Sequence, residues 1–472
     1  MQRVRVLPAV LVLGYFILLL SNRCDFAAGP DSSGYLNQAR LLLDGKISTT
    51  VGILAEAGLD PSLVYLFTPY GFTRATTAGA MVPTYPIGTS LHLAAPAIGG
   101  WGQAPFVVVP VCAIGCLFLT AFVAQRLGVS RGWAIVAAAM LAGFPVFIAQ
   151  AVQPVSDVLA TFWALAAIAC ALRADEHRRW AALCGVAFAI GVAVRPTNIL
   201  LVVPLLVAMR LRWPRVAIAA VAVAPFALAL AWHHHALYGS PWMTGYGGVG
   251  GILSFSALPP CLSRQTAWLL TMATPLVAGG LFVAFQRSMD AWKRALLVSW
   301  FAVFFVFYAY YSFCPDHSST RFLLPAMPAL LIGFVFILSR IPRAAAVAIV
   351  LIVLAREVQQ VGRLHVLHLD EWESIYPRTV EWVDREVPRN AIVMSAITSG
   401  AFHFHSDRDV VRWDQLTPET FALLRANPIL AGRPWYAVVS AVEGGRDALR
   451  ARVPGEWREA GKIRDVTVWR LE

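Results

Sequence analysis

The chain has 472 residues, of which 58% are apolar and 14% are charged, and its formal net charge is +11. A soluble domain carries roughly 25% charged residues, so this composition excludes a soluble globular enzyme, a disordered chain and a secreted disulfide scaffold. Repeated apolar stretches that are long enough to cross a bilayer instead predict a polytopic membrane protein.

The charged residues are unevenly distributed along the chain. From Arg356 onward 33 of 117 residues are charged, whereas only 32 of the preceding 355 are. This contrast predicts a membrane domain over 1–357 and a small water-soluble domain over 358–472. The membrane part holds the whole basic excess. This argues against nucleic-acid binding, because a nucleic-acid module carries its excess on a soluble face.

The apolar runs predict an all-α membrane domain of about eleven transmembrane helices. We expect these helices near residues 4–20, 104–125, 133–150, 155–172, 180–194, 197–209, 216–237, 266–286, 295–312, 321–338 and 344–357. A shorter apolar segment, 86–100, contains prolines and several glycines, and we interpret it as an interfacial helix.

The loop charges indicate which side of the cell membrane each loop faces. With a cytoplasmic N-terminus, 15 of the 22 basic residues of the membrane part fall in cytoplasmic loops, as the positive-inside rule requires. An odd number of spans then makes the C-terminal domain extracytoplasmic. The alternative for the first helix is a cleaved signal peptide, which would not change the sidedness of the later loops.

The predicted first outer loop, 21–83, contains the segment Asp31-Ser-Ser-Gly-Tyr35. Apolar residues at spacings of three and four come after it, which predicts an amphipathic helix with Asp31 just before it. Two interpretations of Asp31 are open, because an aspartate before a helix is a common N-cap and a carboxylate on this loop could also act in catalysis.

A second acid, Asp157, lies at the outer end of a predicted span. Acids at membrane depth are costly and usually functional, and a helix cap is the alternative. Arg195 and Arg321 lie at the same predicted face, against the positive-inside bias. We therefore expect an anionic partner such as a lipid phosphate, with snorkelling to ordinary headgroups as the alternative.

Three other features concern aromatic, histidine and cysteine residues. The glycine-rich segment 238–248, with Tyr246, is interpreted as an outer loop whose aromatic rings either anchor in the membrane or stack on sugars. His403 and His405 could share one face of a strand, and we assign them no metal. Outside the predicted spans, the odd number of cysteines leaves a Cys261–Cys314 disulfide undecided. The third cysteine there is Cys24.

The C-terminal domain alternates apolar strands with helical stretches, which indicates a small α/β domain. The predicted strands are 390–397, 409–413, 436–441 and 466–471, and the predicted helices are 379–386, 418–426 and 445–452. Its expected role is to bind acceptor or product, or to brace the first loop.

Together these residues resemble a known family. The pattern Asp31-x-x-x-Tyr35-x-x-x-Ala39 followed by Gly45, directly after the first span, resembles the GT-C glycosyltransferases that use polyprenyl-phosphate sugars. The most similar group is that of the protein mannosyltransferases and aminoarabinose transferases. Three further segments resemble the same group: Tyr85-Pro-Ile-Gly88, Gly191-Val-Ala-Val-Arg195-Pro-Thr-Asn198 and Arg321-Phe-Leu-Leu-Pro325-Ala-Met-Pro328.

The resemblance implies an integral membrane glycosyltransferase that moves a sugar from a polyprenyl-phosphate donor to an acceptor hydroxyl on the outer face of the membrane. It assigns the family's catalytic acid/base to Asp31. Many relatives have a second acid where this chain has Ser32, which leaves open whether Asp157 assists. Branches of the superfamily also differ in their need for a divalent cation, and the sequence does not decide this.

The resemblance also suggests candidates for binding the substrates. Arg321 and Arg195 are the expected ligands of the donor phosphate. The expected substrate-binding side chains are those of Tyr35, Tyr85 and Tyr246. The acceptor is a protein, a lipid or a glycan.

Two other function classes remain as alternatives. A lipid-linked sugar flippase or transporter predicts polar residues within several spans and inverted repeats, and the sequence has few intramembrane charges. A polysaccharide ligase or polymerase would use similar outer loops.

Overall fold

The computed structural model describes residues 3–248, 253–311 and 317–472. Within it the chain forms two compact units, each assembled from segments that are distant in sequence. The helical unit comprises Met1–Arg23, Val107–Ala231 and Gly247–Leu369. The mixed unit comprises Cys24–Phe106, Trp232–Tyr246 and Asp370–Glu472.

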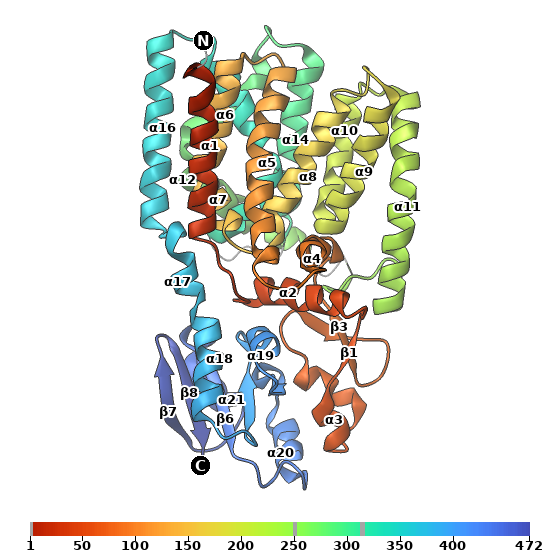
Figure 1. Cartoon of the computed structure of the whole chain (residues 1–472), viewed down its shortest axis with the longest axis vertical. Coiled ribbons are helices and arrows are strands. Elements are labelled where there is room, and N and C mark those ends of the chain that lie inside the picture. Colours follow the sequence, from red (N-terminus) through yellow and green to blue (C-terminus); the bar gives the residue numbers. More distant parts are fainter. Residues whose placement is uncertain (1–2, 249–252, 312–316) are drawn as a thin grey trace. The chain divides into compact units, whose positions relative to one another are not determined.

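The helical unit consists of apolar helices joined by short connections (Figure 1). Its α-helices, including two that continue across the unit boundary, are α1 (Arg3–Ser21), α5 (Ala104–Arg126), α6 (Arg131–Gly143), α7 (Pro145–Ala151), α8 (Ser156–Ala171), α9 (Arg178–Val194), α10 (Val202–Ala208), α11 (Trp213–Tyr238), α12 (Leu258–Met272), α13 (Thr274–Ala278), α14 (Ala291–Ala309), α15 (Met327–Leu338) and α16 (Arg343–Arg363). Its 3₁₀ segments are η3 (Pro196–Leu201), η5 (Phe255–Ala257), η6 (Gly279–Phe285), η7 (His317–Ala326) and η8 (Val366–His368).

The apolar helices indicate a membrane protein, but the expected number of eleven spans is not confirmed. Among the described residues five helices are long and apolar enough to cross a membrane, or seven if each of two bent pairs is one span. Three further apolar helices, Ala9–Ser21, Ser156–Ala171 and Pro196–Ala208, are shorter than the roughly 20 residues that a hydrocarbon core requires.

Prolines explain why two expected spans are bent. The predicted span 133–150 is split into α6 and α7, which meet at 66° just before Pro145. The predicted span 266–286 is split at Thr274, where the chain turns by 112°. Thr274 has a φ of +66° and precedes Pro275, and a residue before proline is disfavoured in the helical region.

The core of the helical unit draws its buried side chains from several helices, among them α5, α6, α8, α9, α14 and α15. Figure 1 shows α8 and α9 side by side, and nearly every residue of α15 is buried. The largest buried side chain there is Trp300, whose Nε1–H donates to the carbonyl of Pro325 at 2.9 Å. This bond joins α14 to the segment that carries Arg321.

The mixed unit contains two sheets. The smaller sheet is antiparallel, in the order β1 (Thr49–Thr50), β3 (Ala80–Pro83), β2 (Phe72–Arg74). The larger sheet has the order β5 (Val410–Val411), β4 (Ile392–Ser395), β6 (Trp435–Ser440), β8 (Val466–Leu471), β7 (Trp457–Ile463). In it β4 is parallel to β5 and β6, and β8 is antiparallel to β6 and β7.

Helices surround both sheets of the mixed unit. The α-helices are α2 (Pro30–Leu43), α3 (Gly52–Glu56), α4 (Ile87–Ala94), α17 (Leu369–Glu373), α18 (Ile375–Glu386), α19 (Ser399–His405), α20 (Pro418–Ala426) and α21 (Gly445–Arg452). The 3₁₀ segments are η1 (Pro61–Phe67), η2 (Ala95–Ala97), η9 (Trp413–Gln415) and η10 (Ala441–Glu443). The expected helix in 86–100 is therefore present as α4 and η2.

The first loop and the C-terminal region share one hydrophobic core. Leu54 and Leu66 of the first loop are buried with Met394 and Trp435 of the larger sheet. The division between units at Leu369 also differs from the expected boundary after residue 357, because α16 continues to Arg363. The first loop thus belongs with the C-terminal region.

Candidate active site

Asp31 lies in the first turn of α2, and it does not cap that helix. The N-cap is Gly29, and Asp31 is the second helical residue, so the N-cap interpretation of Asp31 is wrong. Its carboxylate is half-buried, and Oδ1 accepts a hydrogen bond from the Tyr85 hydroxyl at 2.9 Å. The chain therefore places a half-buried carboxylate in the first turn of a largely buried helix, where it accepts a hydrogen bond from a tyrosine.

All three expected substrate-binding tyrosines gather beside Asp31 within the mixed unit. The ring centroids of Tyr35 and Tyr85 are 4.8 Å apart, and the Tyr246 ring meets Tyr85 edge-on at 5.9 Å. Tyr35 is 4% exposed, whereas Tyr246 is 52% exposed. The cluster thus runs from a buried ring, Tyr35, to an exposed ring, Tyr246.

Glycines make this cluster possible. A Cβ at Gly34 would lie 2.2 Å from Tyr85 Cε2, and a Cβ at Gly245 would lie 2.1 Å from the Thr84 carbonyl oxygen. Real Cβ atoms do not come so close to other atoms. The Gly34 of the Asp31-Ser-Ser-Gly-Tyr35 motif therefore lets the Tyr85 ring lie on α2.

Glu373 is a second carboxylate near Asp31, and no sequence pattern pointed to it. Its Oε2 accepts a hydrogen bond from the Gly29 backbone N–H at 3.2 Å. Burial raises the pKa of Glu373, the Gly29 N–H opposes this rise, and the Asp31 charge adds to it. Glu373 lies beyond the apolar part of α16, and no sequence signal links it to a residue 344 positions away.

In the helical unit, Asp157 and Arg195 form an ion pair. Asp157 is 2% exposed and is the second residue of α8, whose N-cap is Val155, so the cap interpretation of Asp157 is also wrong. Arg195 ends α9 directly before Pro196. A carboxylate so deeply buried requires a cation beside it, and Arg195 supplies it.

Arg195 and Arg321, the two expected phosphate ligands, lie around the same aromatic ring. Their guanidinium carbons are 5.2 and 5.4 Å from the centroid of Phe322. Tyr308 stacks on this ring at 5.1 Å, and its hydroxyl donates to Thr197 Oγ1 at 2.8 Å. The helical unit therefore brings together two cations that the sequence separates by more than 100 residues.

The remaining residues of the Arg195 motif support the turn after α9. The Asn198 side-chain amide donates to the Ala160 carbonyl of α8 at 3.0 Å. A Cβ at Gly191 would lie 3.1 Å from Asn198 Nδ2, so the glycine leaves space for this amide. The motif thus attaches the turn on which Arg195 lies to helix α8, on which Asp157 lies.

The structure corrects the element expected for His403 and His405 and leaves the pairing of the outer cysteines open. His403 and His405 lie on the helix α19 and not on a strand. In the part of the chain that is described, no group of three or more metal-ligating side chains could hold an ion. Cys24 is a buried thiol. Cys314 lies outside the described residues, and with it the question of a disulfide to Cys261.

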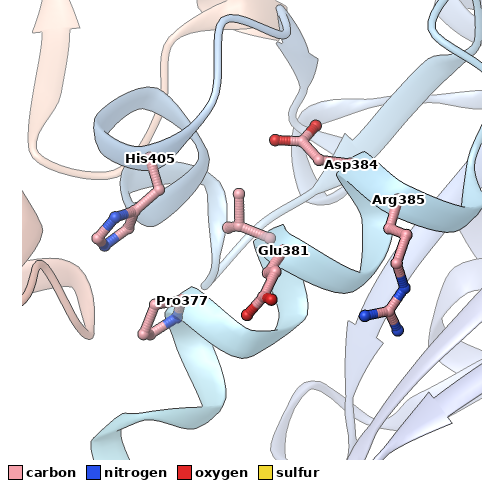
Figure 2. A pocket seen from close by; sticks show the side chains of 6 residues that line it. Pro377, Glu381, Asp384, Arg385 and His405 are labelled. Carbon is pink, nitrogen blue, oxygen red and sulfur yellow. The ribbon is translucent and has the colours of Figure 1, made fainter.

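A surface pocket of about 520 Å³ lies beside α18 and α19. Figure 2 shows Pro377, Glu381, Asp384 and Arg385 along one helix and His405 on another. Asp384 is already engaged by Arg408, whose Nε lies 2.7 Å from its Oδ1. We assign this pocket no part in the reaction.

Comparison with known proteins finds solved structures with a similar fold. No family model matches the chain, and no curated protein matches its sequence. Its structure is similar to that of ArnT from Cupriavidus metallidurans bound to undecaprenyl phosphate, with 13% identity, a TM-score of 0.61 and coverage of 98% of this chain and 97% of ArnT.

Two other solved structures share this architecture. One is the Archaeoglobus fulgidus oligosaccharyltransferase tethered with an acceptor peptide, at 10% identity, a TM-score of 0.57 and coverage of 94% of this chain and 70% of that one. The other is the arabinofuranosyltransferase AftD from Mycobacteria, at 16% identity, a TM-score of 0.51 and coverage of 99% and 41%. The fold of this chain is therefore the membrane fold of GT-C glycosyltransferases that its motifs resemble.

Proposed function

We propose that the protein is a membrane glycosyltransferase that moves a sugar from a polyprenyl-phosphate donor to an acceptor hydroxyl on the outer face of the membrane. The observation that carries this proposal is the carboxylate of Asp31, held by the Tyr85 hydroxyl at 2.9 Å, in a chain with the ArnT fold. The bound undecaprenyl phosphate of ArnT supports an isoprenoid phosphate as the donor's leaving group.

In the proposed reaction Asp31 is the general base. It takes the proton of the acceptor hydroxyl while that oxygen attacks the anomeric carbon of the sugar. The bond between this carbon and the phosphate oxygen breaks, its electron pair stays on the phosphate, and the anomeric centre is inverted. Tyr246, the exposed ring of the tyrosine cluster, offers a surface on which a sugar can stack.

The leaving phosphate is a stable anion and needs charge neutralisation more than protonation. We assign this task to Arg321 and Arg195, which gather around Phe322, because cations placed where charge develops stabilise the transition state. Asp157 was a candidate for catalysis. Its burial and its pairing with Arg195 favour a role in holding that arginine.

The test is a transfer assay in proteoliposomes with radiolabelled polyprenyl-phosphate sugars, followed by identification of the labelled product. Asp31→Asn is expected to lower the rate by about 10²- to 10⁴-fold, the range for loss of a general base. The matched control is Asp44→Asn, which removes an exposed acid at the other end of the same helix and should leave the rate unchanged.

Arg321→Ala tests the phosphate site separately, and we expect it to raise the KM for the donor. Wild-type transfer by Asp31→Asn would remove this residue from the mechanism, and an unchanged donor dependence of Arg321→Ala would refute the phosphate role. If the wild-type protein moved the labelled lipid across the bilayer without forming a product, the protein would instead be a transporter.

A further inference from the structure

The backbone just before Asp31 is held by two side chains from the C-terminal region. Glu373 Oε2 accepts a hydrogen bond from the Gly29 N–H at 3.2 Å. His405 Nε2 lies 2.9 Å from the carbonyl oxygen of Ala27. A carbonyl oxygen only accepts hydrogen bonds, so Nε2 is the protonated nitrogen of this imidazole. We call these two side chains, Glu373 and His405, the clamp.

The clamp acts on the residue at which α2 begins. Gly29 is the N-cap of α2 and has no side chain with which to cap it. Its carbonyl accepts from the Ser33 backbone N–H at 3.0 Å and from Ser33 Oγ at 2.9 Å. Since Asp31 lies within this turn, a shift of Gly29 would move the Asp31 carboxylate with it.

The helix that carries His405, α19, is firmly attached to α2. A Cβ at Gly400 would lie 2.3 Å from Ser33 Oγ, so α19 packs on α2 with no side chain between them. The Asn37 amide donates to the Gly400 carbonyl at 2.9 Å, and Arg40 Nη1 donates to the Phe404 carbonyl at 2.5 Å. His405 therefore reaches Ala27 from a helix that is itself bonded to α2.

We propose that Glu373 and His405 are positioning residues that set the place of the Asp31 carboxylate for proton transfer through their hydrogen bonds to the backbone of Gly29 and Ala27. This inference rests on the proposed function, because it assigns a role relative to Asp31. Asp31 lies on the first loop and the clamp on the C-terminal region, and both belong to the mixed unit.

The hydrogen bond, and not the charge, is what the proposal assigns to Glu373. Glu373→Gln keeps an oxygen acceptor at the same reach and should retain kcat within about threefold. Glu373→Asp keeps the charge but withdraws the acceptor by one methylene, and Glu373→Ala removes it. Both should lower kcat per folded molecule by about 10- to 100-fold, since a displacement of about 1 Å can cost 10²-fold. The KM for the donor should stay within about twofold.

Variants of His405 test the proposal independently of the Glu373 variants. His405→Ala should lower kcat as Glu373→Ala does, and His405→Gln, whose amide still donates to a carbonyl, should recover part of the loss. The matched control is Glu381→Ala, which removes an exposed acid from the neighbouring helix α18 and should leave kcat unchanged. The concentration of folded protein is measured for each variant by size-exclusion chromatography and thermal unfolding.

Three results would overturn the proposal. In the first, the Glu373 variants lower the yield of folded protein but leave kcat per folded molecule at the wild-type value. In the second, Glu373→Gln loses as much activity as Glu373→Ala. In the third, Glu373→Asp is as active as the wild type. If Glu373→Ala fails to fold, the comparison of the other two variants still tests the proposal, because Glu373→Gln should have a higher kcat than Glu373→Asp.

Asp31→Asn is assayed in parallel so that the two hypotheses can fail separately. If this variant transfers sugar at the wild-type rate, the proposed function is wrong whatever the clamp does. If it is inactive while every clamp variant keeps the wild-type kcat, the proposed function stands and only the inference about the clamp is wrong.

Discussion

The helical and mixed units each hold an aspartate at the same place in a helix, with different surroundings. Asp157 is the second residue of α8 and Asp31 the second residue of α2. Asp157 is 2% exposed and forms an ion pair with Arg195. Asp31 is half-buried and accepts a hydrogen bond from the Tyr85 hydroxyl. Position in a helix therefore does not decide what an acid does.

The partner of each carboxylate decides its chemistry. A buried carboxylate in an ion pair is neutralised, and taking up a proton would break the pair. A carboxylate has about four acceptor sites, and a hydroxyl that donates to it takes one of them. We therefore propose a structural role for Asp157 of the helical unit and a chemical role for Asp31 of the mixed unit.

The largest expected effect comes from breaking the ion pair. Asp157→Asn leaves Arg195 partly buried without its carboxylate and should lower the free energy of unfolding by about 3–5 kcal/mol. Asp31→Asn should change it by about 1 kcal/mol or less, because the asparagine oxygen can still accept from Tyr85. Unfolding of both variants in detergent, followed by circular dichroism, measures the difference.

The double variant with Asp157→Asn and Arg195→Gln is the control for this prediction. It removes both charges, so it should recover part of the stability that the single variant loses. If Asp157→Asn were no less stable than Asp31→Asn, Asp157 would not have the structural role that we propose for it.

The next effect disturbs the surroundings of Asp31 without changing any charge. In Gly34→Ala the new Cβ would lie 2.2 Å from Tyr85 Cε2, so the ring must move. Crowding of this kind costs about 1–3 kcal/mol, and the hydroxyl should leave Asp31. We expect a lower melting temperature and a lower transfer rate together.

A helical glycine in open space provides the matched comparison. Gly362 lies in α16 with no atom within 4 Å of its built Cβ. Gly362→Ala should therefore be neutral or should stabilise the chain by roughly 0.5–1 kcal/mol, the helix preference of alanine over glycine. Similar losses in both variants would show that crowding against Tyr85 is not the cause.

The sequence pointed to several residues that the structure brings together, but not to all of their partners. The motif at Asp31 and the later segment with Tyr85 predicted two members of one cluster, which the structure brings together. Glu373 was missed because it contacts Gly29 from 344 residues away, and no local pattern records such a contact. The Asp157–Arg195 pair was missed because each residue was interpreted alone, as an acid and as a phosphate ligand.

The fold was predicted where periodicity is strong. Helices α20 and α21 have the predicted bounds, 418–426 and 445–452. Strand β7 was missed because most of its side chains are at least partly exposed, so it lacks a clear apolar alternation. Alternating apolar and histidine residues at 401–405 imitate a strand, but they form α19 because that helix packs on α2.

A smaller effect should result from removing the bond to Asp31 alone. Tyr85→Phe keeps the ring beside Tyr35 and Tyr246 but has no hydroxyl for Asp31. We expect the transfer rate to fall about tenfold, equal to about 1.4 kcal/mol, with stability nearly unchanged. Steady-state kinetics measure it. The control is Tyr65→Phe, which removes a tyrosine hydroxyl from η1, in another part of the mixed unit, and should keep the wild-type rate. An equal loss in both variants would show that the bond between Tyr85 and Asp31 is not the cause.

The smallest effect concerns Glu443, a carboxylate of the mixed unit that accepts hydrogen bonds from two backbone N–H groups. Glu443 accepts hydrogen bonds from the backbone N–H groups of Ile397 at 2.9 Å and Ser440 at 2.7 Å. Burial raises the pKa of Glu443 and outweighs these two N–H groups, which lower it. Protonation is therefore easier for this acid in the folded state than in the unfolded chain.

The sign of the pH dependence is set by this raised pKa. A folded state that binds the proton more tightly gains stability as the pH falls and loses it as the pH rises through the folded pKa. Glu443→Gln cannot titrate, so the melting temperature of the wild type minus that of the variant should be larger at pH 5 than at pH 7.5. A difference that is constant or larger at pH 7.5 would mean that the two N–H groups suffice to stabilise the charged form. Glu443 would then resemble Asp157, whose charge is stabilised by its partner.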